Sequence, residues 1–358
     1  MKKHSIGYLI LPLLLIPSLG YARLGSSLGV NEMYDSADVV LKGEVVGIGK
    51  SSPIKFSSKE LVASPSKRFL KTVGSEAVSA KIRVDKIFKG TVSGNTIEVN
   101  FYSAKSQDFQ KLSQGEAVLL FLKRDADKLY LLSYDYGKIP DKITMVSRKQ
   151  GIGKSGQEGF VGELEEMSVA KDTSTVLAGM DGLISLKAPN SASIFRQHLS
   201  DSRLSVRAKA ILGLVQLGDS EGNKEFLKEL QSDTMNSSNL TGQERQEARW
   251  EFIQAMMYMG NSKKTEYSKI LIPLVNSKDK FIRQASINAL RQIKSEDAVP
   301  TFVALLDDPD FKVQYMAVIS LCEINNPKKT GCPSSVLFGQ NPQKYITEWK
   351  KWWSTHKK

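Results

Sequence analysis

The sequence predicts a multidomain chain in which a small β-rich domain precedes an all-helical solenoid. After residue 172, apolar residues recur at helical spacing and in the same phase in several segments. Before residue 147, five short runs rich in valine, isoleucine, leucine and aromatics are bounded by glycine, asparagine or aspartate. At 358 residues and 41% hydrophobic residues, the chain is long enough for two or three soluble domains. We predict a signal peptide over 1–22, a β-barrel domain over 23–146, a glycine-rich linker over 147–172, and a solenoid with a C-terminal capping helix over 173–358.

The first 22 residues have the pattern of a secretory signal peptide. Two lysines precede an apolar run over residues 6–19, and Gly20 and Ala22 occupy the small-residue positions of a cleavage site. The alternative is a membrane anchor, but the run is shorter than the roughly 20 residues that a spanning helix needs. We therefore expect an exported protein, periplasmic or secreted, that is cleaved near Ala22.

Export determines how the two cysteines are interpreted. Cys322 and Cys332 are the only cysteines of the chain, and an even, closely spaced pair in an oxidising compartment usually forms a disulfide. The predicted bridge closes a local turn and stabilises by roughly 2–3 kcal/mol. The alternative is a pair of free thiols packed in a helical core.

Four segments of the C-terminal half align on the anchors Val206, Ala248, Ile282 and Val313. Each has residues suited to one buried stripe at offsets of 4, 5 and 8, as a helix of 3.6 residues per turn requires. A shorter apolar helix follows each of the first three, and small residues at offset 4 predict close helix contacts. A capping box, Thr241 to Glu244, is expected to satisfy amide groups where the second of these helices begins.

These segments resemble HEAT repeats. "DSRLSVRAKAILGL" supplies the aspartate turn, the valine–arginine pair, the alanine and the leucine of the family pattern, and "DKFIRQASINAL" repeats most of it. Gln314 replaces the usual arginine in the last repeat, and Phe252 occupies the small position of the second. The resemblance implies a stack of helical hairpins with an extended surface for binding other proteins.

The five strand-like runs predict a small barrel or sandwich. The phrases "VVLKGEVVGI", "VDKIFKG" and "GEAVLLFLKR" resemble the TIMP/netrin-like OB fold of the tissue inhibitors of metalloproteinases. Inhibitory members of that family place an N-terminal cysteine on the protease zinc, and this chain has no cysteine before Cys322. Zinc chelation is therefore not implied, and a binding scaffold remains.

Two further segments are candidate partner contacts. The long loop between the first two predicted strands is either a contacting loop or a mobile, solvated one, and its basic residues are Lys55, Lys59, Lys67, Arg68 and Lys71. Near the C-terminus, Trp349, Trp352 and Trp353 fall at helical spacing. That helix either caps the solenoid or binds a partner or a membrane surface.

Charge and residue types exclude several function classes. The net charge of +12 is compatible with nucleic acid, anionic lipid or an acidic protein, but export makes nucleic acid the poorest match. Gly151, Gly153 and Gly156 match the glycine spacing of a dinucleotide-binding loop. Such a loop must open a helix, and the sequence predicts none there. His198 and His356 stand apart, so neither a metal set nor a catalytic triad is indicated. We expect no enzyme, no cofactor and no small-molecule ligand.

The sequence thus predicts an exported, non-enzymatic scaffold or adaptor that binds a protein partner through the solenoid and the barrel. Two alternatives stay open. One is a protease inhibitor or regulator that acts through the barrel without ligating zinc, and the other is an envelope-associated structural protein that contacts a membrane surface.

Overall fold

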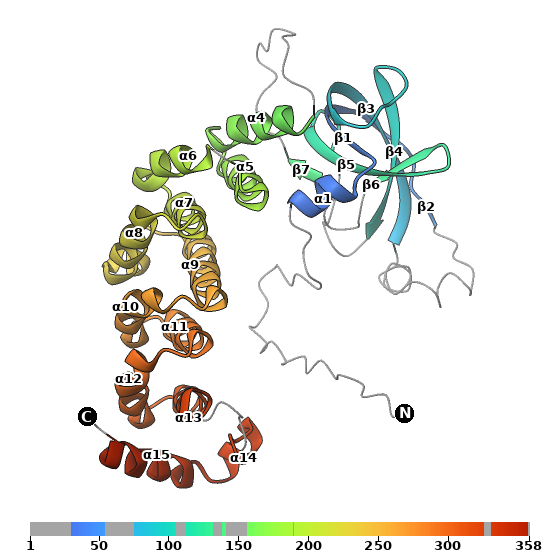
Figure 1. Ribbon diagram of the computed structural model, residues 1–358. Helices are drawn as coiled ribbons and strands as arrows, with labels where there is room; N and C mark the ends of the chain where they lie inside the picture. Colours follow the sequence, from blue (N-terminus) through green and yellow to red (C-terminus); the bar gives the residue numbers. More distant parts are fainter. Residues whose placement is uncertain are drawn as a thin grey trace, which may run out of the picture.

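The fold is that of a β-barrel followed by a curved double row of helices (Figure 1). A computed structural model describes residues 30–53, 75–104, 112–131, 138–140, 156–188, 190–325 and 331–356. The predicted signal peptide and the basic loop residues lie outside these ranges. In the part of the chain that is described, no helix is long and apolar enough to span a bilayer.

Five strands form the barrel in the order β1-β3-β4-β6-β5, and β5 pairs with β1 to close it. All neighbours are antiparallel except β4 and β6, which run parallel. This closed order confirms the predicted small barrel. Two short strands extend it, β2 beside β3 and β7 beside β5. The strand bounds are β1 Val39–Ile48, β2 Ser52–Pro53, β3 Ser75–Lys89, β4 Thr96–Ala104, β5 Ala117–Asp125, β6 Lys128–Leu131 and β7 Lys138–Pro140.

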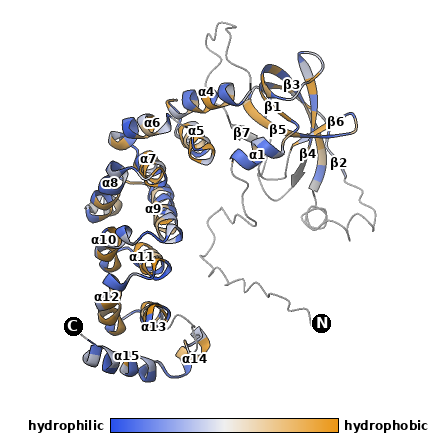
Figure 2. Cartoon of the chain, in the orientation of Figure 1, coloured by the Kyte–Doolittle hydropathy of each residue, from blue (hydrophilic) through white to orange (hydrophobic). Residues whose placement is uncertain are grey.

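Strand β5 is apolar on both faces because both of its faces are covered. Val118, Leu120 and Leu122 point into the barrel core, whereas Leu119 and Phe121 belong to a second core beneath the helices. A strand with one solvated face would alternate apolar and polar residues. The apolar part of β5, coloured orange in Figure 2, therefore marks the side of the barrel on which helices pack.

The helices after residue 172 form two rows (Figure 1). The outer row consists of α6 Ser191–Gln197, α8 Ser220–Gln231, α10 Ser268–Leu271 and α12 Val299–Ala304. The inner row, on the concave side of the curve, consists of α5 Thr173–Leu186, α7 Leu204–Gln216, α9 Gly242–Ser262, α11 Lys280–Ile293 and α13 Phe311–Asn325. Helices α14 Ser335–Gln340 and α15 Pro342–His356 close the end.

The inner row confirms the alignment of the four segments predicted from the sequence. All four anchors, Val206, Ala248, Ile282 and Val313, are fully buried. The small residue Ser286 donates from its hydroxyl to the Leu271 carbonyl of α10 at 2.6 Å. A longer side chain would hold these two helices apart. In α9 the same offset carries the larger Phe252, which is fully buried, so the small-residue pattern does not extend to that repeat.

The predicted linker over 147–172 is wrong for residues 156–168, which form α4 (Gly156–Ser168). Its glycines were expected to disfavour a helix, at about 1 kcal/mol each. Burial of Phe160, Leu164 and Met167, none of which is exposed, outweighs that cost. Close packing also explains Gly179 of α5, where an added Cβ would lie 2.7 Å from the Leu164 carbonyl oxygen.

Helix α4 joins the barrel to the solenoid through one shared core. Phe160 lies among three aromatic rings, with centroid distances of 4.9 Å to Tyr34 of α1 (Val30–Ser36), 5.6 Å to Phe88 and 5.8 Å to Phe121. The same core continues into α5 and α7. The two domains therefore share buried apolar surface rather than meeting through a linker.

A buried ion pair crosses the same junction. The Lys42 amine of β1 donates to Glu163 Oε1 of α4 at 2.5 Å, and both side chains are almost inaccessible to solvent. Removing one member of such a pair leaves an uncompensated charge in an apolar setting.

We predict that Lys42→Met alone lowers the free energy of unfolding by about 3–5 kcal/mol, because Glu163 stays buried without its amine. The double variant Lys42→Met/Glu163→Leu should recover most of that loss, because both charges leave together. Urea unfolding of the full chain measures both. A double variant as unstable as the single one would contradict this account of the junction.

Candidate interaction surface on the inner face of the solenoid

The inner helices are positioned by hydrogen bonds made in the turns that precede them. Arg207 donates from Nη1 to the Asp201 carbonyl at 2.6 Å, and Arg283 donates in the same way to the Ser277 carbonyl at 2.6 Å. Gln314, the departure noted in the last repeat, donates from Nε2 to the Asp308 carbonyl at 2.8 Å. The amide thus replaces the guanidinium in holding the turn, and the repeat stacks regularly despite the substitution.

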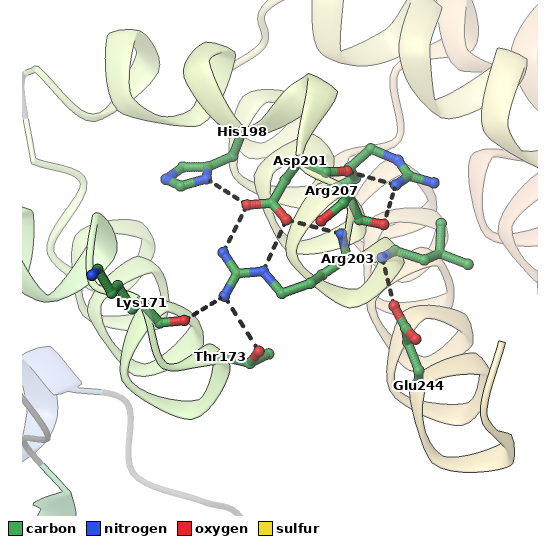
Figure 3. Close-up of polar contacts among 9 residues, drawn as sticks. Lys171, Thr173, His198, Asp201, Arg203, Arg207 and Glu244 are labelled. Atoms are coloured by element: carbon green, nitrogen blue, oxygen red, sulfur yellow. Dashed lines mark hydrogen bonds and ion pairs between the residues drawn. The ribbon is translucent and has the colours of Figure 1, made fainter. Parts of the chain in front are cut away.

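Asp201 lies at the centre of the network drawn in Figure 3. Its carboxylate accepts two hydrogen bonds from the Arg203 guanidinium, at 2.9 and 2.7 Å, and one from the Arg203 amide at 2.9 Å. His198 Nδ1 lies 3.4 Å from the same carboxylate. Arg203 also reaches the Lys171 carbonyl at 3.2 Å, so the network fastens α7 to the turn before α5.

The charge of Asp201 is set by these contacts. Hydrogen bonds from Arg203 hold the pKa of Asp201 well below its ordinary value, although partial burial opposes the shift. The carboxylate is therefore ionised at any pH near neutrality. Asp201 and His198 form a structural turn, and no described nucleophilic side chain is hydrogen-bonded to His198.

The capping box is confirmed in one half and wrong in the other. The Thr241 hydroxyl accepts from the Glu244 amide at 3.1 Å, as predicted. The Glu244 carboxylate instead accepts from the Leu204 amide at 2.8 Å, so it caps α7 of the preceding repeat (Figure 3). Glu244, in the first turn of α9, thus joins two repeats.

Replacement of Asp201 by asparagine is expected to lower the free energy of unfolding by about 1–3 kcal/mol near neutral pH. The folded pKa is lowered, so this contribution is complete above the pKa of an unfolded aspartate, about 4. It is lost as the pH falls through the folded pKa. The difference between the variant and the parent should therefore shrink in acid.

Urea unfolding at a series of pH values measures this difference. Asp307→Asn is the control, because the Asp307 side chain is exposed and its ion pair with Lys350 should change stability little at any pH. A difference for Asp201→Asn that did not depend on pH would show that the ionised carboxylate is not what stabilises the turn.

A buried cation links three inner helices in the first half of the row. Lys209 of α7 contacts Asp181 of α5 at 2.5 Å and Glu251 of α9 at 2.8 Å. Burial alone would lower the pKa of Lys209, but the two carboxylates outweigh it and the pKa is raised. The amine therefore stays charged and holds α5, α7 and α9 together.

The second half of the inner row has an apolar groove instead. A cavity of about 330 Å³ lies between α9, α11 and α13. Its lining is mainly apolar, and Ile253, Met257, Phe281, Ala285 and Met316 provide it. Met257 is 44% exposed, and Trp250, which lies about two turns earlier and therefore on the same side of α9, is 45% exposed. The inner face therefore leaves large apolar side chains accessible where α9 and α11 meet.

The C-terminal helix covers the last repeat, as the capping interpretation predicts. Trp349, Trp352 and Trp353 of α15 are half-buried and pack against the solenoid core. Ile346 is buried, and Lys350 pairs with Asp307 of the neighbouring repeat at 2.5 Å. The partner-binding interpretation of these tryptophans stays a prediction.

Cys322 and Cys332 form the predicted disulfide, with their Cα atoms 5.7 Å apart. Cys322 lies near the end of α13, and Cys332 precedes α14. The bridge therefore fixes the point at which the chain leaves the last inner helix and enters the C-terminal cap.

Cys322→Ala/Cys332→Ala is expected to lower the free energy of unfolding by roughly 2–3 kcal/mol, because the unfolded chain regains the freedom of the closed loop. A thiol reductant should shift the unfolding midpoint of the parent protein by a similar amount and leave the double variant unchanged. The same reductant shift in both proteins would contradict a role for this bridge.

The remaining candidate residues are dispersed. Lys55, Lys59, Lys67, Arg68 and Lys71 lie outside the described residues, as do the first five residues of the pattern from Gly151 to Gly156. His356 stacks on Trp352 in α15, far along the chain from His198. Within the described ranges, no group of three or more histidine, cysteine, aspartate or glutamate side chains could hold a metal ion.

One protein-family model matches part of this chain. Residues 237–322 match a family model described as HEAT repeats. The match includes α9 to most of α13 and therefore contains the groove. A crystal structure of an engineered protein is similar at 16% identity, with a TM-score of 0.35, over 54% of this chain and 97% of that chain. A search of curated proteins finds no match. The resemblance of the barrel to the TIMP/netrin-like fold is not confirmed.

Sequence reasoning missed most of the groove residues. The alignment kept only the apolar positions shared by all repeats, which include Ile253 at offset 5, whereas Met257, Phe281 and Met316 lie outside the offsets of 4, 5 and 8. The available signal was the presence of large apolar residues outside the shared stripe, because the stripe alone accounts for the core.

Proposed function

We propose that the chain is an exported, non-enzymatic scaffold that binds a protein partner on the inner face of its solenoid. HEAT repeats suggest a protein-interaction scaffold, and the match lies where the inner face carries its apolar groove. The single observation that supports this most directly is the exposure of Trp250 and Met257 on a concave surface, because large apolar side chains left accessible together mark interaction sites.

Export is supported by two independent features. The disulfide is compatible with an oxidising compartment. The first 22 residues have the signal-peptide pattern described above. A protease inhibitor acting through the barrel and an envelope-associated structural protein stay as alternatives.

Site-specific crosslinking distinguishes the proposed function from the inhibitor alternative. A photo-crosslinking amino acid is placed in the full chain at Trp250 on the inner face, at Lys269 on the outer row or at Ile48 on the barrel. The three proteins are irradiated in the extracytoplasmic fraction of their own host. We expect a protein adduct from Trp250 and none from Lys269.

Mass spectrometry identifies the adducts. An adduct from Ile48 alone would favour action through the barrel, since Ile48 is an exposed apolar residue at the end of β1. Equal adducts from Trp250 and Lys269, or none from Trp250, would contradict binding on the inner face.

A further inference from the structure

The groove between α9, α11 and α13 has two lysines beside its apolar lining. None of the residues that line it is acidic, and Lys312 is among them. The Lys280 amine lies 5.1 Å from the centre of the Phe281 ring, which forms part of the lining. Lys280 is the first residue of α11, and Lys312 is the second of α13, a helix packed beside it.

These two lysines are not neutralised within the described part of the chain. No ion pair there joins Lys280 or Lys312 to a carboxylate. Arg249 also stacks on Phe281, but its guanidinium is already paired with Asp279 at 2.7 Å. The groove therefore offers apolar surface together with two exposed amines that can pair with carboxylates of a ligand.

We propose that this groove binds an acidic protein segment, which inserts one bulky apolar side chain over Phe281 and places carboxylates beside Lys280 and Lys312. The inference rests on the proposed function, because it gives the chemical class of the partner. A cavity of about 330 Å³ accepts a large side chain, and the amides of Gln284 and Asn288 can hydrogen-bond the backbone of the segment.

Charge and shape disfavour two other occupants. A second copy of this chain, with a net charge of +12 in full or +10 without Lys2 and Lys3 of the predicted signal peptide, would bring like charge against these lysines. An anionic membrane has the right charge, but its surface is flat, whereas the groove lies between α9, α11 and α13. These helices belong to the row on the concave side of the solenoid (Figure 1). A single extended or helical segment fits this curvature.

Three labelled peptide probes test the proposal by fluorescence polarisation with the full chain. The first is a short peptide with one phenylalanine flanked by glutamates. The second replaces the glutamates with lysines, and the third replaces the phenylalanine with serine. Phosphatidylglycerol vesicles serve as the membrane arm. We expect the first peptide to bind at least about tenfold more tightly than the other two.

Matched variants locate the binding site. Lys312→Glu and Met257→Ser should each weaken binding of the first peptide about tenfold or more. The charge control is Lys269→Glu, since Lys269 is also the second residue of its helix, α10, but lies in the outer row. The apolar control is Leu217→Ser, since Leu217 is 42% exposed at the end of α7. Lys269 and Lys312 are both exposed, so the charge reversals should not unfold the protein.

Thermal unfolding shows that each variant is folded before its affinity is compared. Binding of the first peptide that survives Lys312→Glu and Met257→Ser would overturn the proposal, as would equal affinity for all three peptides. Vesicle binding lost in the same two variants, without peptide binding, would overturn it in favour of a membrane. If no peptide binds while Trp250 still crosslinks a protein, the acidic-segment inference fails and the scaffold function stands.

Discussion

The insertion of Phe160 into an aromatic cluster on the barrel is the contact on which the arrangement of the whole chain depends. Helix α4 carries it, and the same helix packs against α5, so barrel and solenoid share one core. The buried pair of Lys42 and Glu163 adds a polar contact that only one orientation of α4 can satisfy. Two domains that sequence composition separates are therefore held as one body, and the direction in which the solenoid leaves the barrel is fixed at its first helix.

From that start, each repeat is placed by polar side chains that reach across to a neighbour. Arg203 contacts the turn before α5, Glu244 caps α7 from α9, and Arg249 binds Asp279 at the start of α11. Apolar stripes alone would permit sliding, because dispersion contacts have little directional preference. Hydrogen bonds to a particular carbonyl or amide select one register, so curvature and spacing follow from these few residues.

The sequence predicted those parts of the fold that rest on periodicity. The buried anchors, the small residue Ser286 and the five strands of the barrel follow from spacing and residue type. Helix α4 could not be predicted in this way, because its glycines have poor helix propensity and its stability comes from a tertiary core formed with residues far away in the chain. The groove was missed for the complementary reason: a shared pattern identifies what repeats have in common, whereas a binding surface lies in what differs between them.

One position shared by the inner helices shows how the differences between repeats divide the inner face into two halves. The residue three places after each anchor is Lys209, Glu251, Ala285 and Met316 in successive repeats. The first two are buried in an ion network with Asp181, so a partner could insert there only by separating desolvated charges, at a cost of several kcal/mol. The last two are uncharged and line the groove, where the short side chain of Ala285 leaves room beside Phe281. The proposed binding is therefore placed in the half of the solenoid between α9 and α13, because the other half already uses this position to hold its own helices together.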